Sequence, residues 1–337
     1  MSGGVDSSLA AALLVEQGYE VTGVYMKNWS QDLPGMKCPW AEDLADAKRV
    51  AVQLGIDFKV FDFEAQYKQK VVDYMLNEYS AGRTPNPDIM CNQEVKFKLF
   101  LETALEEGAD MIATGHYART SDGQLLRARD ENKDQTYFLY RVTREALAKT
   151  LFPLGEYTKT EVRHMASERG LWTAAKKESM GVCFVGNVGM REFLSHYITT
   201  QPGDIIDARS RRTVGRHDGA IFYTLGQRHG LDVGGGLPYY VVGKDMAKNE
   251  VYVTTDLNDE HMWRAQLQLN EEHWIDDVPT DGFTYQIRVR HRAPLIAARY
   301  SENTHTLIPA DMQRAVTPGQ SVVVYDGELC LGGGIIQ

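Results

Sequence analysis

The sequence predicts an α/β region with a parallel sheet at the N-terminus, a small β-rich central region and a C-terminal β-barrel. In the first half of the chain, apolar runs with helical spacing alternate with short β-rich runs, which is typical of βαβ units on a parallel sheet. From about Ser195 the helical periodicity fades, and short strands bounded by Gly, Asp and Pro follow one another as in a closing barrel. We therefore expect domains at residues 1–194, 195–260 and 261–337.

The expected elements of the α/β region follow from their apolar spacing. Apolar residues at helical spacing predict helices, and β-rich apolar runs between turn residues predict strands. Such sheets bind ligands at the carboxyl ends of their strands, which is where Met26, Gly115 and His116 fall. Helices are expected at 9–15, 40–54, 66–79 and 94–107, and strands at 20–26, 58–63 and 111–114.

The remaining elements are short strands. Each is a β-rich run bounded by Gly, Asp or Pro. In the central region they are expected at 203–206, 220–224, 239–242 and 250–254. In the barrel they are expected at 266–269, 283–291, 306–308, 320–325 and 328–331.

Composition excludes several classes of protein. The 337 residues are 43% hydrophobic and 24% charged, as in ordinary globular proteins, and no apolar run approaches the ~20 residues that cross a bilayer, so no membrane partner is expected. Four widely spaced cysteines argue against a disulfide scaffold or structural zinc, and no metal-ligand set is expected. With no targeting segment visible, we expect a cytoplasmic protein; a mitochondrial one stripped of its presequence is the alternative.

The first eight residues form the most informative stretch. Backbone N–H groups of a Gly-rich loop before a helix N-terminus make a concave anion site, and serines add hydroxyl donors. Asp6 suits a magnesium-side ligand or a helix cap, and no Walker lysine follows the loop. An N-capped surface helix is the plain alternative. The expected nucleotide-binding residues are Met1, Ser2, Gly3, Gly4, Val5, Asp6, Ser7 and Ser8, with Met26 and Gly115 beside the adenosine.

The start of the chain carries one further expectation. A strand normally leads into a loop of this kind, and no residue precedes Met1 to form it. Loss of a central strand would be severely destabilising, so we expect a longer natural N-terminus. An intact mass of the native protein equal to that of these 337 residues would contradict this expectation.

Two further stretches bring cysteines together with polar groups. In the run from Arg83 to Asn92, two prolines fix a rigid turn, and Asp88 and Cys91 face one cavity if a helix begins there. For Asp88 the plain alternative is a helix N-cap. In the run from Lys176 to Phe184, lysines and a glycine flank Cys183, which favours a reactive thiolate. Taken singly, each cysteine is better explained as a buried small apolar residue.

The charge distribution leaves the kind of partner open. The formal net charge is −10, so the overall balance does not indicate a nucleic-acid partner. Two arginine-rich segments are either solvated faces or phosphate-contacting surfaces. They contain Arg209, Arg211, Arg212 and Arg216, and Arg288, Arg290, Arg292 and Arg299.

The first loop resembles the SGGxDS loop of N-type ATP pyrophosphatases, which have an adenine nucleotide α-hydrolase-like fold. The whole chain resembles one family among them, the tRNA-specific 2-thiouridylases. It departs from their pattern in the missing first strand and in Met180, where many bacterial members have Thr. The shared blocks, in family order, are MSGGVDSS, MKNW, GRTPNPDIMCN, ATGHYAR, KDQTYFL, KKESMGVCF, YTLGQR and TPGQ.

The resemblance implies ATP-dependent 2-thiolation of a tRNA wobble uridine, with Mg²⁺ neutralising the phosphates. The flipped-out uridine is adenylated at its C2 oxygen, and Cys183 carries sulfur as a persulfide received from a relay protein or cysteine desulfurase. Cys91 is then the nucleophile that leaves a Cys91–Cys183 disulfide, whether persulfide sulfur attacks directly or free sulfide is released. Asp88 is the general acid/base, and Asn86, Pro87 and Asp88 contact the base.

The resemblance also implies a set of tRNA contacts. Two other readings remain: an ATP pyrophosphatase that adenylates a different acceptor, and a tRNA-binding protein with a regulatory ATP site. Pyrophosphate release that depends on tRNA separates the last reading from the others. The implied tRNA contacts are His116, Lys133, Asp134, Gln135, Arg290, His291 and Gln320.

Overall fold

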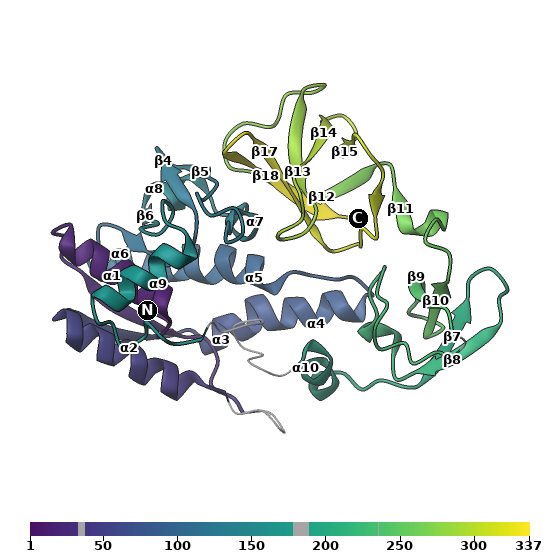
Figure 1. Ribbon diagram of the computed structural model, residues 1–337, viewed down its shortest axis with the longest axis horizontal. Coiled ribbons are helices and arrows are strands. Elements are labelled where there is room, and N and C mark those ends of the chain that lie inside the picture. Colours follow the sequence, from purple (N-terminus) through teal and green to yellow (C-terminus); the bar gives the residue numbers. More distant parts are fainter. Residues whose placement is uncertain (33–37, 178–188, 235) are drawn as a thin grey trace.

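A computed structural model describes residues 1–32, 38–177, 189–234 and 236–337. Figure 1 shows the α/β region on the left, the C-terminal barrel above and the central β region on the right. The predicted order of the three parts is confirmed. One segment of the α/β region pairs with a sheet of another region. A hairpin of the α/β region, β4 (Arg119–Ser121) and β5 (Gln124–Leu126), joins the barrel sheet.

The strands of the α/β region are parallel, as predicted. They form two pairs that are not hydrogen-bonded to each other among the described residues: β1 (Thr22–Lys27) with β2 (Asp57–Asp62), and β3 (Ile112–Ala113) with β6 (Thr150–Leu151). At the edge of β1, the buried amino group of Met1 donates to the carbonyl of Val24, and burial lowers its pKa to about 5.

Helices pack around these strand pairs, and none of the described helices is long and apolar enough to cross a membrane. The predicted helix 66–79 contains a π-helical stretch, Lys68–Val72, and the helix expected at 94–107 begins earlier, at Pro87, and contains another, Cys91–Leu99. The α-helices are α1 (Val5–Glu16), α2 (Trp40–Leu54), α3 (Glu64–Tyr67), α4 (Asp73–Ser80), α5 (Pro87–Met90), α6 (Phe100–Glu106), α7 (Thr136–Leu139), α8 (Arg144–Ala148), α9 (Lys159–Glu168) and α10 (Met190–Tyr197).

Helix α1 positions the first loop because it is apolar nearly all round. Such a helix must be covered on several sides, and α1 packs against both α2 and α9. Leu9 is fully buried in this cluster, which also contains Val162 and Leu171. The loop that precedes α1 is thereby anchored in the core of the α/β region.

The central region is a four-stranded sheet in the order β8-β7-β10-β9. Its strands are β7 (Gly203–Asp207), β8 (Thr213–His217), β9 (Tyr240–Asp245) and β10 (Glu250–Thr254). The prediction of a strand at 220–224 is wrong. Ala220–Phe222 forms a 3₁₀ turn instead, and the side chains of Ala220 and Ile221 are buried. Strand β8 was not predicted, because apolar and polar residues do not alternate in its sequence. It forms by hydrogen-bonded pairing with β7.

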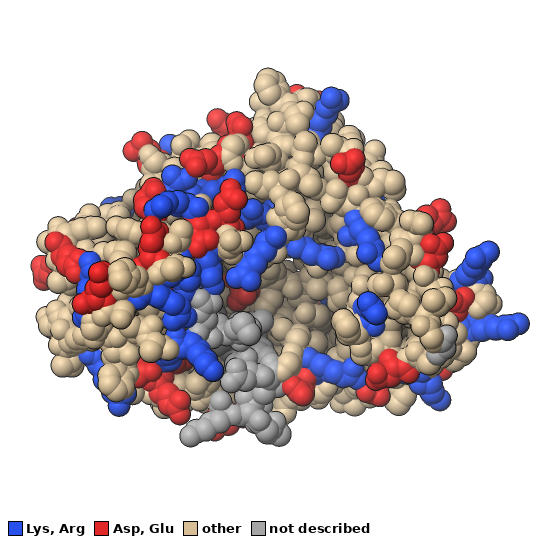
Figure 2. All heavy atoms as spheres, viewed as in Figure 1, with Lys and Arg blue, Asp and Glu red and all other residues tan. Residues whose placement is uncertain are grey.

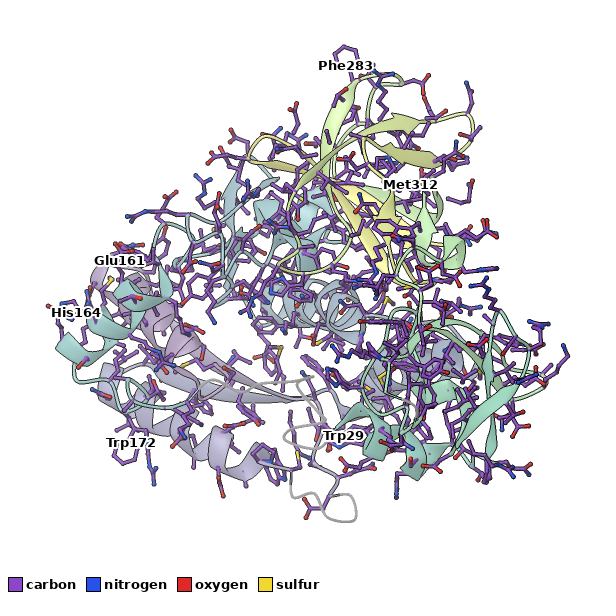
Figure 3. All side chains as sticks on the ribbon, turned by 45° about the vertical axis from the view of Figure 1, so that its right-hand side comes forward. Trp29, Glu161, His164, Trp172, Phe283 and Met312 are labelled. Carbon is purple, nitrogen blue, oxygen red and sulfur yellow. The ribbon has the colours of Figure 1, made fainter. Side chains whose placement is uncertain are left out.

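The C-terminal barrel closes because β12 pairs with both β15 and β18. Its two most exposed apolar side chains, Phe283 and Met312, are labelled in Figure 3. A short pair, β11 (Trp263–Arg264) and β16 (Gln313–Arg314), lies beside it. The barrel strands are β12 (Leu267–Trp274), β13 (Thr284–Arg288), β14 (Ile296–Ser301), β15 (Thr306–Pro309), β17 (Ser321–Asp326) and β18 (Leu329–Ile336), of which β14 was not predicted.

Barrel closure yields a prediction at Gly333 of β18. A Cβ there would lie 2.1 Å from the carbonyl oxygen of Val322, so Gly333→Ala must displace backbone. We expect a loss of about 1–3 kcal/mol in the free energy of unfolding, measured by urea denaturation. Gly243→Ala in β9 is the control, because its Cβ would meet nothing closer than 3.6 Å. Equal midpoints for the two variants would contradict this account.

Candidate active site

A cavity of about 810 Å³ lies beside the N-terminus of α1, within the size range of small-molecule sites. Its wall contains residues predicted to contact the nucleotide or the tRNA, because the N-terminus of α1 and the carboxyl ends of β1 and β3 meet there. Gly3, Gly4, Val5 and Ser8, also expected at the site, are not part of the wall. The predicted residues on the wall are Met1, Ser2, Asp6, Ser7, Met26, Gly115, His116 and Gln135.

The loop before α1 is built for close backbone approach. Gly3 has a φ of +71°, and a Cβ there would lie 2.3 Å from the carbonyl oxygen of Asp43. A Cβ on Gly115 would lie 2.8 Å from the amide nitrogen of Ser7. Gly4 is the N-cap and supplies no side chain to the first amides of α1. These features suit an anionic group bound at the helix N-terminus.

Asp6 is held by two residues that sequence analysis missed. Its carboxylate oxygens accept from Lys159 Nζ at 2.7 and 2.8 Å, and one of them accepts from the Tyr117 hydroxyl at 2.9 Å. The helix-cap alternative for Asp6 is wrong, because the cap is Gly4. No group of three metal-ligating side chains occurs in the described part of the chain. The ion pair places the ammonium group of Lys159 next to the loop, with its charge balanced by Asp6.

The second informative stretch begins a helix, which the sequence left open. The Asn86 side chain accepts from the amides of Asp88 and Ile89, at 3.1 and 3.4 Å, and Pro87 occupies the first helical position. Asn86, not Asp88, is therefore the N-cap. Burial raises the pKa of Asp88, and the positive charge of Lys96 acts in the opposite direction.

Cys91 is 1% exposed and begins the π-helical stretch Cys91–Leu99. Such stretches are frequent at functional sites. Cys183 lies outside the described residues, so its predicted pairing with Cys91 stays a prediction. The described cysteines Cys38, Cys91 and Cys330 are buried, and no disulfide joins any two of them.

His116 follows β3 and faces the cavity. Its Nδ1 lies 2.8 Å from the hydroxyl of Thr114, and its ring packs against Phe97 and Phe152. Burial, with a contribution from Lys96, lowers the pKa of His116 well below its ordinary value. The imidazole is therefore neutral at pH 7 and contacts its neighbours as a ring and a hydrogen-bonding group, not as a cation.

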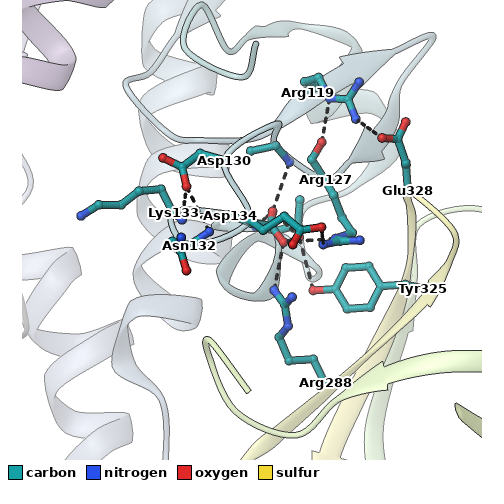
Figure 4. A network of polar contacts seen from close by, with 12 residues as sticks. Arg119, Arg127, Asp130, Asn132, Lys133, Asp134, Arg288, Tyr325 and Glu328 are labelled. Carbon is teal, nitrogen blue, oxygen red and sulfur yellow. Dashed lines mark hydrogen bonds and ion pairs between the residues drawn. The ribbon is translucent and has the colours of Figure 1, made fainter. Parts of the chain in front are cut away.

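Asp134 lies inside the protein, although sequence analysis placed it against tRNA. It is 1% exposed, and its Oδ2 lies 3.0 Å from Nη1 of Arg288 in β13 (Figure 4). Thr136 donates to the same carboxylate, and Arg127 lies 3.6 Å away. A carboxylate enclosed by these groups is not available to an RNA strand. Its neighbour Gln135 accepts from the Tyr117 amide at 2.8 Å and lines the cavity.

The expected contacts from the barrel lie where it meets α7. The His291 ring is 4.5 Å from that of Phe138, and burial, together with Arg292 and Arg288, lowers the pKa of His291 to about 4. The guanidinium of Arg290 donates to the carbonyl of Ala315. Gln320 has a buried side-chain oxygen with no hydrogen-bond donor among the described residues.

All three parts of the protein meet just before Asn86. The Thr84 amide donates to the carbonyl of Pro318 in the barrel at 2.8 Å, and its hydroxyl lies 3.4 Å from that of Thr224 in the central region. Gly319 has a φ of +89°, and a Cβ there would lie 2.9 Å from the Thr84 nitrogen. Lys and Arg side chains gather around the hollow in the middle of the face shown in Figure 2.

Comparison with known proteins gives full-length matches. Three family models match: a tRNA methyl transferase HUP domain at 1–187, its PRC-barrel domain at 191–255 and an aminomethyltransferase β-barrel domain at 264–336. Curated tRNA-specific 2-thiouridylases of Geobacillus kaustophilus and Geobacillus thermodenitrificans are 48% identical, over 100% of this chain and 93% of theirs. One from Bacillus mycoides is 47% identical, with the same coverage.

Solved structures give weaker matches. An NMN synthetase of Francisella tularensis is 16% identical with a TM-score of 0.36, over 53% of this chain and 63% of that one. An NH₃-dependent NAD synthetase of Campylobacter jejuni is 17% identical with a TM-score of 0.32, over 51% of this chain and 62% of that one.

The buried ion pair yields a prediction. Asp134→Asn keeps the shape of the side chain but leaves Arg288 buried without its charge partner, so we expect the free energy of unfolding to fall by about 3 kcal/mol in denaturant titrations. Glu328→Gln is the matched control: its pair with Arg119 joins the same two regions, but Glu328 is 71% exposed, and a change below about 0.5 kcal/mol is expected. Equal losses would contradict the assignment.

His291 yields a pH prediction. Its pKa falls from 6.5 to about 4 on folding, so between these values the unfolded chain binds a proton that the folded chain does not. Stability is therefore lost as the pH falls from about 6.5 to about 4. In His291→Gln we expect this slope to be shallower, measured by denaturant titration at several pH values. A slope equal to that of the wild type would rule out this contribution.

Proposed function

Because the chain belongs to the tRNA-specific 2-thiouridylase family, we propose that the cavity beside α1 binds ATP and that Asn86 to Cys91 receive the wobble uridine. The protein is a tRNA-uridine 2-sulfurtransferase, as its full-length relatives indicate. The observation that carries the site proposal is the convergence of Ser2, Asp6, Ser7, Met26 and Gly115 on one cavity of ligand size.

The loop before α1 supports phosphate binding by its backbone. The close approach of Gly115 to Ser7 leaves no room for a side chain between them, and the first turn of α1 has no side-chain cap. Phosphate oxygens would accept from these amides and from the serine hydroxyls. Lys159, held by Asp6, would add charge stabilisation as pyrophosphate leaves.

Mg²⁺ fits this site as the ATP complex. Asp6 and Asp43 line the cavity, but each pairs with a lysine, so the described residues offer no carboxylate cluster to a free ion. Mg²⁺ is usually held by substrate phosphates with one or two carboxylates. Bound in this way, it would neutralise the negative charge of the phosphates.

In the first chemical step, the C2 oxygen of the flipped-out uridine attacks the α-phosphate of ATP, and pyrophosphate leaves. The adenylated oxygen is a far better leaving group than a carbonyl oxygen. Asp88 would transfer the proton between uridine N3 and solvent, and the upward shift of its pKa by burial supports this role. Asn86 and Pro87 would hold the base beside it.

In the second step, the terminal sulfur of a Cys183 persulfide attacks C2, and AMP leaves. Cys91 then attacks the Cys183 sulfur, which releases 2-thiouridine and forms a Cys91–Cys183 disulfide that a thiol reductant reopens. Release of free sulfide by Cys91, followed by its attack on C2, is the alternative route. The persulfide would come from a cysteine desulfurase or a sulfur relay protein in the cytoplasm.

The tRNA contacts would lie around the target base. Lys133, Gln135 and His116 would approach the RNA from the α/β region, and Arg290, His291 and Gln320 from the barrel. The unsatisfied oxygen of Gln320 supports this assignment, because a buried acceptor needs a donor. Asp134 would act indirectly, by fixing the loop that carries Lys133 and Gln135.

The test combines purified protein, Mg-ATP, a persulfide donor and unmodified tRNA with a wobble uridine. Mass spectrometry of the digested tRNA detects replacement of oxygen by sulfur, and pyrophosphate release is measured in parallel. We expect Cys91→Ala and Cys183→Ala to lose thiolation by at least about 100-fold while still releasing pyrophosphate. Cys330→Ala, at a buried barrel position, is the control and should retain thiolation. Full thiolation by Cys91→Ala would overturn the proposed role of Cys91.

A further inference from the structure

We propose that the arginine-bearing hairpin of β7 and β8 binds the phosphate backbone of the substrate tRNA outside its anticodon stem-loop. This inference rests on the proposed function, since it assumes that the substrate is tRNA. The hairpin consists of Gly203–Asp207, Thr213–His217 and the turn between them. It carries four exposed arginines within eight residues, Arg209, Arg211, Arg212 and Arg216.

The turn of the hairpin is ordered by its own hydrogen bonds. The carboxylate of Asp207 accepts from the amide of Ser210 at 2.6 Å, and its carbonyl accepts from the amide of Arg211 at 2.8 Å. The Asp207 amide in turn donates to the carbonyl of Arg212 at 2.9 Å. The carboxylate of Asp207 therefore stabilises the turn, and the arginine side chains extend from an ordered backbone.

The four arginines differ in whether their guanidinium groups already contact other side chains of the protein. The guanidinium of Arg211 lies 5.3 Å from the centre of the Tyr252 ring, and that of Arg216 lies 3.8 Å from the exposed Asp204 carboxylate. The guanidinium groups of Arg209 and Arg212 form no hydrogen bond or ion pair with any described residue, although the charge of Arg209 contributes to the lowered pKa of Asp207. Both side chains are exposed, so they can meet an external anion.

The position of the hairpin relative to the proposed base-binding residues indicates which part of the tRNA it contacts. Figure 1 shows it at the outer end of the central region, beyond β9 and β10 as seen from α5. In the same view of the surface, Lys and Arg side chains stand out at that end (Figure 2). An anticodon held at Asn86 to Cys91 would leave the hairpin facing a more distant part of a long RNA.

A simpler explanation of the four arginines is that they protect an edge strand from pairing with other chains. Strand β8 lies at the edge of its sheet, and charged side chains prevent edge strands from pairing with other chains. Lysine is the usual residue in that role, whereas arginine presents a planar fork that fits phosphate oxygens. With a net charge of −10, the protein as a whole repels RNA, so binding must come from local basic surfaces such as this one.

The test compares Arg209→Gln/Arg212→Gln with the wild type. We measure the dissociation constant at several salt concentrations for full-length tRNA and for the isolated anticodon stem-loop, and kcat at saturating tRNA. We expect about fivefold weaker binding of full-length tRNA and a salt slope reduced by about 1 to 2. Stem-loop binding and kcat should not change.

Two further variants separate local contact from net charge and from folding. Arg209→Lys/Arg212→Lys keeps both charges and should restore most of the affinity. Lys48→Gln/Lys149→Gln removes two exposed charges elsewhere and should bind tRNA as the wild type does. An unchanged affinity and salt slope in the hairpin variant, or an equal loss with the stem-loop, would overturn the inference. A wild type that does not bind or thiolate tRNA would instead overturn the proposed function.

Discussion

The structure depends on one buried carboxylate. Asp134 comes from the α/β region and Arg288 from the barrel, and both are almost fully enclosed where the two regions meet. A buried ion pair gives little net stability, because desolvation offsets its attraction, but it strongly penalises any arrangement that separates its members. This pair therefore specifies how the barrel sits on the α/β region. The neighbouring contact of Thr136 with the Tyr325 hydroxyl adds to the same constraint.

Two other connections join the same parts. Strand β5 pairs with β18, so the barrel sheet continues into the α/β region through backbone hydrogen bonds. At Thr84 the barrel and the central region both contact the chain just before Asn86. The residues proposed to receive the uridine thus follow directly from a point that all three parts fix. The barrel, the central region and the start of α5 are therefore held together at this point.

The cavity proposed to bind ATP and the helix proposed to bind the base both lie at a helix N-terminus that follows a turn. Gly3 and Gly4 precede α1, and Asn86 precedes Pro87 at the start of α5. The first is left without a side-chain cap, so its amides are available to phosphate oxygens. The second is capped by Asn86, which orders Asp88 and the helix that leads to Cys91.

The sequence by itself determined the elements whose signals are local. Helix α2 lies where its apolar spacing predicted it, since that signal depends on residues a few positions apart. The helix expected at 94–107 was found only in part, because it already begins at Pro87. Only the tertiary structure decided that Asp134 is internal and that Lys159 holds Asp6, because those partners are 154 and 153 residues away. Strand β8 and the turn at Ala220–Phe222 likewise depend on the sheet around them. The burial of a polar group is a property of the assembled fold, and local periodicity does not reveal it.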